Sequence, residues 1–314
     1  MKAIILNNSG SVDNFNYVHV SKPSIKENEV LVKVTSVSVN PVDYKARENE
    51  GTLNWLFGEQ RPVILGWDLS GIIQEVGKNV SDFKIDDAVF GMANFPGNGS
   101  AYAEYVAVPS SHLTLKPANI SHQEAAAATL AVLTAWQALV TNGNIKKDNK
   151  VLIHGASGGV GHYAIQIAKH FGAYVIGTSS EKNKEFVLQN GADQHIDYSK
   201  VNFEEVVSDV DLVLNTVSNE INTRSVTVTK SGGKIIYILG AVPQEILDAA
   251  KNKSIEIKSI LVQSSGEDMK TIADLMEQGI IKSHISKEFT FDEMASAHLQ
   301  LATSHTVGKV VVNI

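Results

Sequence analysis

The hydrophobic and polar positions of this chain follow one pattern up to about residue 115 and another after residue 121. In the first part apolar residues alternate with polar ones, as in residues 30–39, and Pro and Gly interrupt the alternation at short intervals. This pattern predicts a β-rich region without a long helix. The second part opens with Ser121 and Glu124, a capping-box pair that predicts the start of a helix. Apolar runs of strand length then alternate with stretches of helical periodicity.

The second part predicts a parallel sheet whose strands are connected by helices. Strands are predicted at residues 151–154, 173–178, 194–197, 211–215, 234–239 and 255–262. Helices are predicted around residues 158–171, 181–190, 201–207, 219–229 and 244–252. Six strands with helical crossovers indicate a doubly wound sheet in the order 3-2-1-4-5-6. After residue 263 the pattern predicts a helix at 267–278, a strand at 286–290, a helix at 291–301 and a last strand at 308–314.

A glycine-rich turn joins the first of these strands to its helix. Gly155 permits a sharp turn close to a pyrophosphate, and Gly161 lets the helix pack close to the sheet. The free N–H groups and the dipole of the helix start attract negative charge. Ala156 replaces the first glycine of the G-x-G-x-x-G pattern, so a glycine turn without a nucleotide is the alternative. The residues expected to contact a dinucleotide here are Ala156, Ser157, Gly158, Gly159, Val160 and Gly161.

Composition and charge narrow the classes of function. The chain has 314 residues and a formal charge of −7, and it contains no block of basic residues, so a nucleic-acid partner is not expected. It has no cysteine, which excludes disulfides and thiolate metal ligands. The apolar run at the N-terminus is too short for a signal peptide, and no stretch is long enough to span a membrane. A cytoplasmic protein without a membrane partner is therefore expected.

Five further segments and the glycine turn together resemble a known family. The segments are residues 39–45 (VNPVDYK), 62–71 (PVILGWDLSG), 99–105 (GSAYAEY), 133–139 (LTAWQAL) and 308–310 (GKV). In this order they resemble the zinc-independent quinone oxidoreductase branch of the medium-chain dehydrogenase/reductase superfamily, which includes alkenal and enone reductases. The resemblance implies an α/β protein in which a doubly wound Rossmann domain is inserted into a GroES-like β-rich catalytic domain.

The resemblance also gives boundaries and an expected assembly. Residues 1–120 and 263–314 would form the catalytic, substrate-binding domain, and residues 121–262 would form the NADPH-binding domain. The alternating segment 254–262 is predicted to be the edge strand of the parallel sheet, and in the family this edge pairs with a second copy. A homodimer is therefore expected.

The positions that hold zinc in other members of the superfamily carry different residues here. Those members use a cysteine near the end of an early strand, the histidine of a Gly-His-Glu, and a later cysteine or acid. In the first two regions this chain has residues 36–40 (SVSVN) and Gly66-Trp67-Asp68. None of the ten histidines is paired with another ligand at helical metal-binding spacing. Without a Lewis acid, alcohol oxidation is disfavoured, and reduction of a quinone or an enone is the expected chemistry. Asp68 is expected to be a structural hydrogen-bond partner.

The end of the second parallel strand predicts the choice of cofactor. NAD enzymes usually place a carboxylate there, about 20 residues past the glycine turn, whereas this chain has Thr178, Ser179 and Ser180 followed by Lys182. The resemblance adds Tyr198, so NADPH is expected, with Ser179, Lys182 and Tyr198 at its 2′-phosphate. The alternative is a capped, solvated helix, and Glu181 favours that alternative. Further expected cofactor contacts are Ser180, Thr134, Asn215, Val217, Leu239, Gly240 and Ala241, for which ordinary strand-end turns are the alternative.

The resemblance implies that a few side chains of the first region face the nicotinamide. Lys45 is expected to stabilise the developing negative charge on the substrate oxygen, Tyr44 is an alternative proton donor, and Asn40 would hold the carboxamide or ribose. Trp67 and Phe95 are expected to line the substrate pocket, whose shape would depend on loops 47–60 and 91–98. The alternatives are a surface lysine for Lys45 and core packing for Trp67.

The predicted function is an NADPH-dependent, zinc-independent reduction of a quinone or an α,β-unsaturated carbonyl compound. A short-chain dehydrogenase is excluded because none of the eight tyrosines is followed by lysine at the fourth position. Two alternatives stay open: a non-catalytic NADPH-binding relative, and a zinc-free alcohol dehydrogenase.

Overall fold

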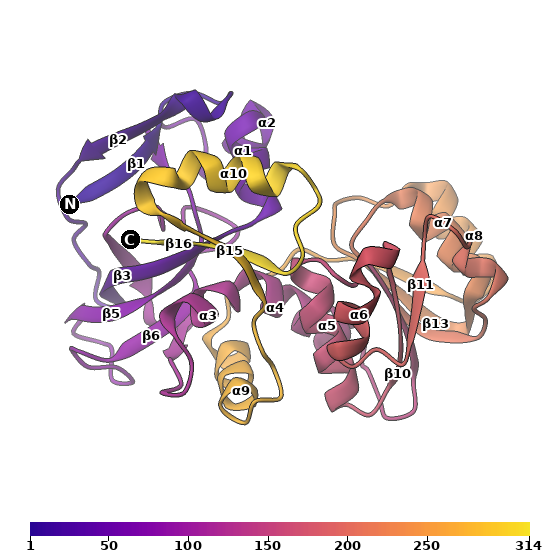
Figure 1. Cartoon of the computed structure of the whole chain (residues 1–314). Helices are drawn as coiled ribbons and strands as arrows, with labels where there is room; N and C mark the ends of the chain where they lie inside the picture. The colour runs from indigo at the N-terminus through magenta and orange to yellow at the C-terminus, as the bar shows by residue number, and fades with distance from the viewer. The chain divides into compact units, whose positions relative to one another are not determined.

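A computed structural model describes residues 1–314, and the chain folds into two compact units (Figure 1). Unit 1 consists of Met1–Leu133 and Gln263–Ile314, and unit 2 of Thr134–Val262. The second unit is thus inserted into the first, as expected, but residues 121–133 belong to unit 1 and not to unit 2. The reason is packing, because the helix that starts after Ser121 lies against strands of the first unit.

Unit 1 contains two sheets. A three-stranded sheet has the order β2-β1-β4, and a seven-stranded sheet has the order β15-β16-β3-β5-β6-β8, with β7 paired to β3. All pairs are antiparallel except β15 with β16. The strands are β1 (Lys2–Leu6), β2 (Phe15–His19), β3 (Glu29–Val39), β4 (Val63–Ile64), β5 (Asp68–Val76), β6 (Ala88–Met92), β7 (Tyr105–Pro109), β8 (Leu113–Leu115), β15 (Ile285–Thr290) and β16 (Lys309–Asn313).

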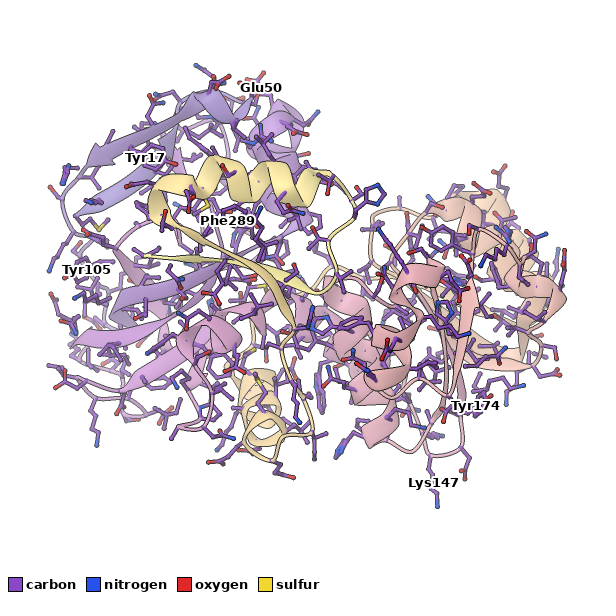
Figure 2. The ribbon with its side chains drawn as sticks, in the orientation of Figure 1. Tyr17, Glu50, Tyr105, Lys147, Tyr174 and Phe289 are labelled. Atoms are coloured by element: carbon purple, nitrogen blue, oxygen red, sulfur yellow. The ribbon has the colours of Figure 1, made fainter.

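Helices connect and cover these sheets. They are α1 (Pro41–Glu48), α2 (Glu50–Phe57), α3 (His122–Ala127), α9 (Gly266–Glu277) and α10 (Met294–Ala302), while α4 (Leu130–Trp136) crosses the boundary between the units. Tyr17 of β2 fastens the C-terminal segment (Figure 2), because its hydroxyl donates to the Asp292 carbonyl at 3.1 Å and its ring meets Phe291 edge-on. The first and last parts of the chain therefore share one core.

Two of these helices were not expected. The sequence predicts no long helix before residue 115 and a loop at 47–60, whereas α1 and α2 fill most of residues 41–57. Pro41 at the first helical position and Asp43, which accepts the Asn40 N–H at 2.6 Å, start α1. Each helix has only eight residues, so the local hydrophobic period is too short to distinguish it from a turn.

The sequence predicts that the helix after Ser121 continues through an alanine-rich run to Leu139, but the structure divides this stretch. Its capping box is present, since Ser121 Oγ accepts the Glu124 N–H at 3.1 Å. However, α3 ends at Ala127 and a new helix begins at Leu130, because the Thr129 hydroxyl bonds the Ala126 carbonyl and the Leu130 N–H is taken by the Asp68 carboxylate. The chain then continues as a π-helical segment at Gln137–Asn142.

Unit 2 is the predicted doubly wound sheet. Its six strands are parallel and have the order β11-β10-β9-β12-β13-β14, which is 3-2-1-4-5-6 in chain order. They are β9 (Lys150–His154), β10 (Tyr174–Ser179), β11 (Gln194–Asp197), β12 (Val210–Asn215), β13 (Thr229–Tyr237) and β14 (Glu256–Ser259). The connecting helices are α5 (Gly159–His170), α6 (Lys184–Gln189), α7 (Asn219–Val228) and α8 (Gln244–Asn252). Tyr174, at the start of β10, is 46% exposed (Figure 2).

Local details of unit 2 differ from the prediction. The helix expected at 201–207 is only the short 3-10 turn Phe203–Glu205, and the helix expected at 181–190 begins as a second such turn. β13 starts earlier than expected, at Thr229, and β14 is only four residues long. The hydrophobic core on one face of the sheet joins Leu152 and Val213 to Ile246, so the packing follows the predicted apolar positions.

No helix of the structure has the length and apolar character needed to cross a membrane.

Candidate functional site

The glycine turn of unit 2 has the geometry of a phosphate cradle. Gly155 adopts φ +71°, and a Cβ at Gly161 would overlap the Gly155 carbonyl oxygen and lie 2.7 Å from Ala156 Cα. The first turn of α5 therefore lies directly against the turn that precedes it. Gly158 is the N-cap of α5, and the first N–H groups of a helix have no partner within that helix. A glycine turn packed in this way against a helix N-terminus fits a dinucleotide pyrophosphate.

Hydrogen bonds hold the cradle in place from two sides. The Ala156 N–H donates to the Thr178 carbonyl at 2.9 Å, which joins the turn to β10. The Thr216 hydroxyl donates to the His154 carbonyl at 2.8 Å, which joins it to the loop after β12. Asn183 donates to the Ser157 hydroxyl at 3.1 Å. These bonds fix the turn between β10 and the loop after β12.

The residues expected at a 2′-phosphate lie together at the carboxyl ends of β10 and β11. The Tyr198 N–H donates to the Ser179 carbonyl at 3.3 Å, and the Tyr198 side chain is 66% exposed. Lys182 is exposed in the 3-10 turn that follows Ser180. Ser179 differs from expectation, because it is only 2% exposed and its hydroxyl already has two partners within the chain.

The nearby carboxylate is paired with lysines. Glu181 lies 3.3 Å from Lys200 and 3.9 Å from Lys184, and all three side chains are about half exposed or more. These two cations offset the negative charge that would repel a 2′-phosphate. The repulsion between Glu181 and a 2′-phosphate is therefore weaker than the position of Glu181 in the sequence suggests.

Some residues of the loops after β12 and β13 are exposed, and others are buried and hydrogen-bonded within the loop. Val217 and Leu239 are 48% and 41% exposed, and Gly240 adopts φ +114° with open space around it. Asn215 is fully buried, since its amide donates to the Ser218 carbonyl and to Asn222 and accepts the Val217 N–H. Asn215 therefore shapes this loop and has no free polar atom for a cofactor. The Ala241 carbonyl accepts a bond from Asn219, and Thr134 is 5% exposed.

In unit 1, Asn40 belongs to a buried polar cluster. Its amide nitrogen donates to Asp68 at 2.7 Å, and its amide oxygen accepts from Lys309 Nζ at 2.5 Å. Lys309 lies 3.6 Å from Asp68, and Asp43 accepts the Asn40 N–H. These four side chains, Asn40, Asp43, Asp68 and Lys309, are at most 3% exposed and are called the Lys309 cluster below. The expected role of Asp68 as a structural partner is what the structure shows, whereas both amide atoms of Asn40 are already used.

Burial shifts the protonation of this cluster. Desolvation raises the pKa of Asp43 to about 7, and the nearby Asp68 charge adds to the rise, while the bond from Asn40 opposes it. Desolvation also lowers the pKa of Lys309, and the two carboxylates oppose that shift. Lys309 thus supplies the only positive charge of this cluster, which also contains two buried carboxyl groups.

Lys45 and Tyr44 lie on the less buried side of α1. Lys45 is exposed, while its neighbours Ala46 and Arg47 are buried. Tyr44 is partly buried, and desolvation raises the pKa of its phenol, as does the charge of Glu48. Lys45 is therefore available to a small molecule in a way that Asn40 is not.

Trp67 and Phe95 form an aromatic cluster with Phe57. Trp67 is fully buried, its indole N–H donates to the Gly97 carbonyl at 2.6 Å, and its ring meets Phe95 edge-on at 5.3 Å. Phe95 is 5% exposed. Trp67 has no exposed surface, which favours the alternative that it packs in the core. Phe57 comes from α2, which the sequence did not predict.

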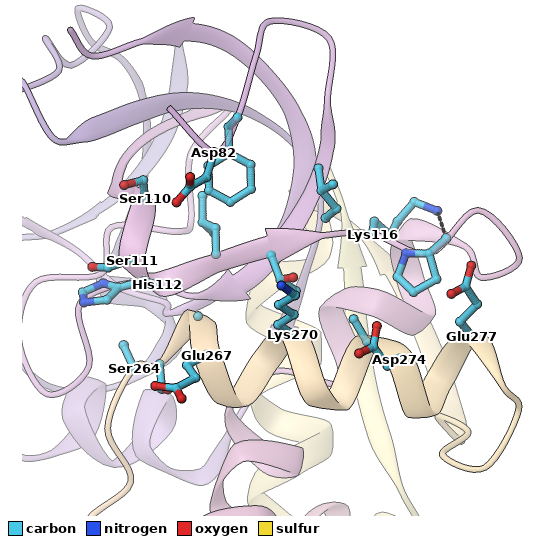
Figure 3. A pocket seen from close by; sticks show the side chains of 18 of the residues that line it. Asp82, Ser110, Ser111, His112, Lys116, Ser264, Glu267, Lys270, Asp274 and Glu277 are labelled. Carbon is cyan, nitrogen blue, oxygen red and sulfur yellow. Dashed lines mark hydrogen bonds between the residues drawn. The ribbon is translucent and has the colours of Figure 1, made fainter. Parts of the chain in front are cut away.

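Two residues that the sequence did not single out fasten the loop that carries Phe95. His112 Nδ1 accepts the Asn94 N–H at 3.2 Å, and Ser264 Oγ accepts the Phe95 N–H at 2.8 Å. Both line a groove of about 880 Å³ between α9 and the segment around β8 (Figure 3). The groove carries both carboxylates and lysines, and none of the expected site residues line it.

No group of three or more histidine, aspartate or glutamate side chains could hold a metal ion.

His154, at the end of β9, is buried between Thr178 and Ser225, and desolvation lowers its pKa to about 3. It is therefore a neutral packing residue beneath the glycine turn.

Comparisons with known proteins agree with this fold. A family model described as "Alcohol dehydrogenase GroES-like domain" matches residues 26–118, and one described as "Zinc-binding dehydrogenase" matches residues 190–312. The chain is 35% identical to a 2-methylene-furan-3-one reductase from Solanum lycopersicum, covering 100% of this chain and 79% of the relative. It is 33% identical to an NADPH-dependent alkenal/one oxidoreductase from Arabidopsis thaliana, covering 99% and 79%.

Among solved structures, the quinone oxidoreductase from Coxiella burnetii superposes with a TM-score of 0.94 at 34% identity, covering 100% of this chain and 99% of that one. A GroES-like β-rich unit with an inserted Rossmann sheet defines a medium-chain dehydrogenase/reductase. The chain belongs to the quinone oxidoreductase and enone reductase family of this superfamily, and it is an oxidoreductase.

Proposed function

We propose that this protein is an NADPH-dependent reductase that transfers a hydride to a quinone or an α,β-unsaturated carbonyl compound without zinc. The observation that carries the proposal is the glycine turn of unit 2, where Gly161 lets the start of α5 lie directly against Gly155 and Ala156, beside a strand end that carries serines and no carboxylate. The tomato and Arabidopsis relatives, named as reductases of a furanone and of alkenals or enones, support this substrate class.

The chemistry asks little of the protein beyond orientation and charge. A bound reduced nicotinamide supplies the hydride. Lys45 stabilises the negative charge that develops on the substrate oxygen, and Tyr44 or solvent gives the proton. Asn215 and the Lys309 cluster act indirectly by fixing loops. Absence of cysteine and the lack of a metal-binding group support a reaction without zinc.

The decisive experiment is a side-by-side assay of NADPH consumption with benzoquinones, naphthoquinones, 2-alkenals and enones. Steady turnover with one class, unchanged by chelators, is the expected result. Consumption with none of them, despite tight NADPH binding, would favour a non-catalytic cofactor-binding protein. NADP-dependent oxidation of alcohols would instead favour an alcohol dehydrogenase.

NADPH is expected to bind at least about tenfold more tightly than NADH, because Lys182 and Tyr198 are exposed at the expected 2′-phosphate position and the end of β10 carries no carboxylate. Fluorescence titration of the purified protein measures both dissociation constants. Lys182→Ala is expected to weaken NADPH more than NADH. Lys147→Ala, at a lysine of the same unit in the turn before β9, is the matched control and leaves both constants unchanged. Equal affinities for the two cofactors in the wild-type protein contradict the prediction.

Lys45→Ala is expected to lower kcat about 10- to 100-fold with little change in NADPH affinity. The reason is that charge develops on the substrate oxygen only as the hydride moves, so a nearby ammonium group stabilises the transition state more than the ground state. Steady-state kinetics and cofactor titration separate the two effects. Lys33→Ala, at an exposed lysine of β3, serves as the control. A normal kcat with weaker NADPH binding would make Lys45 a cofactor contact.

The homodimer stays a proposal. It is supported by the position of β14 at the edge of the parallel sheet, where it pairs only with β13 and is mostly exposed. Light scattering at micromolar concentration measures the mass.

A further inference from the structure

His195 of β11 is bonded to the buried serine at the end of the neighbouring strand. Its Nε2 lies 2.9 Å from Ser179 Oγ. The strands are parallel, with Gly177 opposite His195 and Ser179 opposite Asp197. His195 therefore reaches across and toward the carboxyl end of β10, to the place where a doubly wound sheet recognises the adenosine ribose of a dinucleotide.

The Ser179 hydroxyl has one proton, so it can donate a hydrogen bond to only one of its two partners. Ser179 Oγ lies 3.1 Å from the Ser180 carbonyl, which can only accept. When the hydroxyl proton goes to that carbonyl, His195 Nε2 must be the donor to Ser179 Oγ. A protonated imidazole has a proton on both nitrogens, so protonation locks this arrangement and adds a positive charge beside it.

The groups around His195 have both signs. Glu181 in the 3-10 turn and Asp197 on β11 favour the protonated ring, whereas Lys184 on α6 disfavours it. Partial burial has the largest influence and lowers the pKa of His195, so the ring is mainly neutral near pH 7 in the free protein. A phosphate monoester next to it would bring between one and two negative charges and would favour protonation.

We propose that His195 is a cofactor-specificity residue, which positions the Ser179 hydroxyl and, on protonation, favours a dinucleotide that carries a 2′-phosphate over one that lacks it. The inference rests on the proposed use of NADPH and deepens it, because it makes the preference for NADPH depend on pH. If protonation of His195 strengthens the binding of NADPH, then bound NADPH must in turn favour protonation of His195. Binding of NADPH therefore takes up protons at His195, and binding of NADH does not.

The test compares dissociation constants for NADPH and NADH at about pH 8 and about pH 6.5. In the wild-type protein the ratio of the NADH constant to the NADPH constant is expected to rise about 3- to 10-fold as the pH falls. His195→Gln keeps a nitrogen donor for Ser179 but cannot become charged. In His195→Gln, the part of the rise in this ratio that comes from protonation of His195 is expected to disappear.

Titration of the cofactor's own 2′-phosphate is common to both proteins, so the comparison between them isolates His195. His170→Gln, at an exposed histidine of the last turn of α5, is the matched control and keeps the wild-type pH dependence. Calorimetry in buffers of different ionisation enthalpy supplies a second readout, with proton uptake expected for NADPH in the wild-type protein and reduced uptake in His195→Gln. Thermal unfolding verifies that the variants are folded.

The possible outcomes separate this inference from the proposed function. A strong preference for NADPH that has the same pH dependence in the wild-type protein and in His195→Gln overturns the role of His195 and leaves the proposed cofactor intact. Equal affinities for NADPH and NADH at both pH values contradict the proposed cofactor and the role of His195 together. A ratio that rises only in proteins that retain His195 supports the proposal.

Discussion

Lys309→Met is expected to lower the free energy of unfolding by about 3–5 kcal/mol, because it removes the only cation of the Lys309 cluster and leaves the buried Asp68 carboxylate without charge compensation. Lys309 Nζ lies 3.6 Å from Asp68 and bonds the Asn40 amide oxygen. The Lys309 side chain is 3% exposed, so water cannot replace it. Chemical denaturation followed by circular dichroism measures the loss.

A double variant distinguishes a missing charge from lost packing. Lys309→Met with Asp68→Asn removes one charge of each sign, so it is expected to recover a substantial part of the stability lost in Lys309→Met. Lys33→Met, at an exposed lysine of β3, controls for the change of residue type and should change the stability by less than about 0.5 kcal/mol. A double variant no more stable than Lys309→Met would show that packing of the lysine stem, and not its charge, is what the fold needs.

Gly161→Ala is expected to weaken binding of NADPH and NADH about 100-fold or more and to lower the free energy of unfolding by about 1–3 kcal/mol. The new methyl group would overlap the Gly155 carbonyl and Ala156, so either the glycine turn or the start of α5 must move. Either movement displaces the N–H groups that face the pyrophosphate. Fluorescence titration measures the affinities, and thermal unfolding measures the stability.

Gly51→Ala is the matched control, since Gly51 lies in the first turn of α2 and a methyl group there meets only the side chain of Asn49, at 3.2 Å. It should leave cofactor affinity unchanged and leave stability unchanged or slightly increased. Unaltered dinucleotide binding in Gly161→Ala would mean that the close approach of α5 to the turn is not what forms the cradle.

The sequence alone was sufficient for the parts of the molecule that depend on local periodicity. The capping box at Ser121 and the glycine turn followed from patterns within a few residues of each other. The order of the six parallel strands followed from the alternation of strands and helices along unit 2, and the structure has all three features. The two short helices α1 and α2 were missed because eight residues hold too few turns to give a period. The family followed from motifs spread along the whole chain, and the relatives confirm it.

Only the tertiary structure decided which polar residues are free for chemistry. Asn40 stands in a motif that predicts a cofactor contact, but its amide is held by Lys309, which lies 269 positions away. Ser179 stands where a phosphate contact is expected, but its hydroxyl is already bonded to His195 on the next strand. Such contacts depend on strand register and on distant packing, and no local pattern of residues encodes them. The sequence therefore predicts a role at the cofactor for both Lys45 and Asn40, whereas in the structure only Lys45 is exposed.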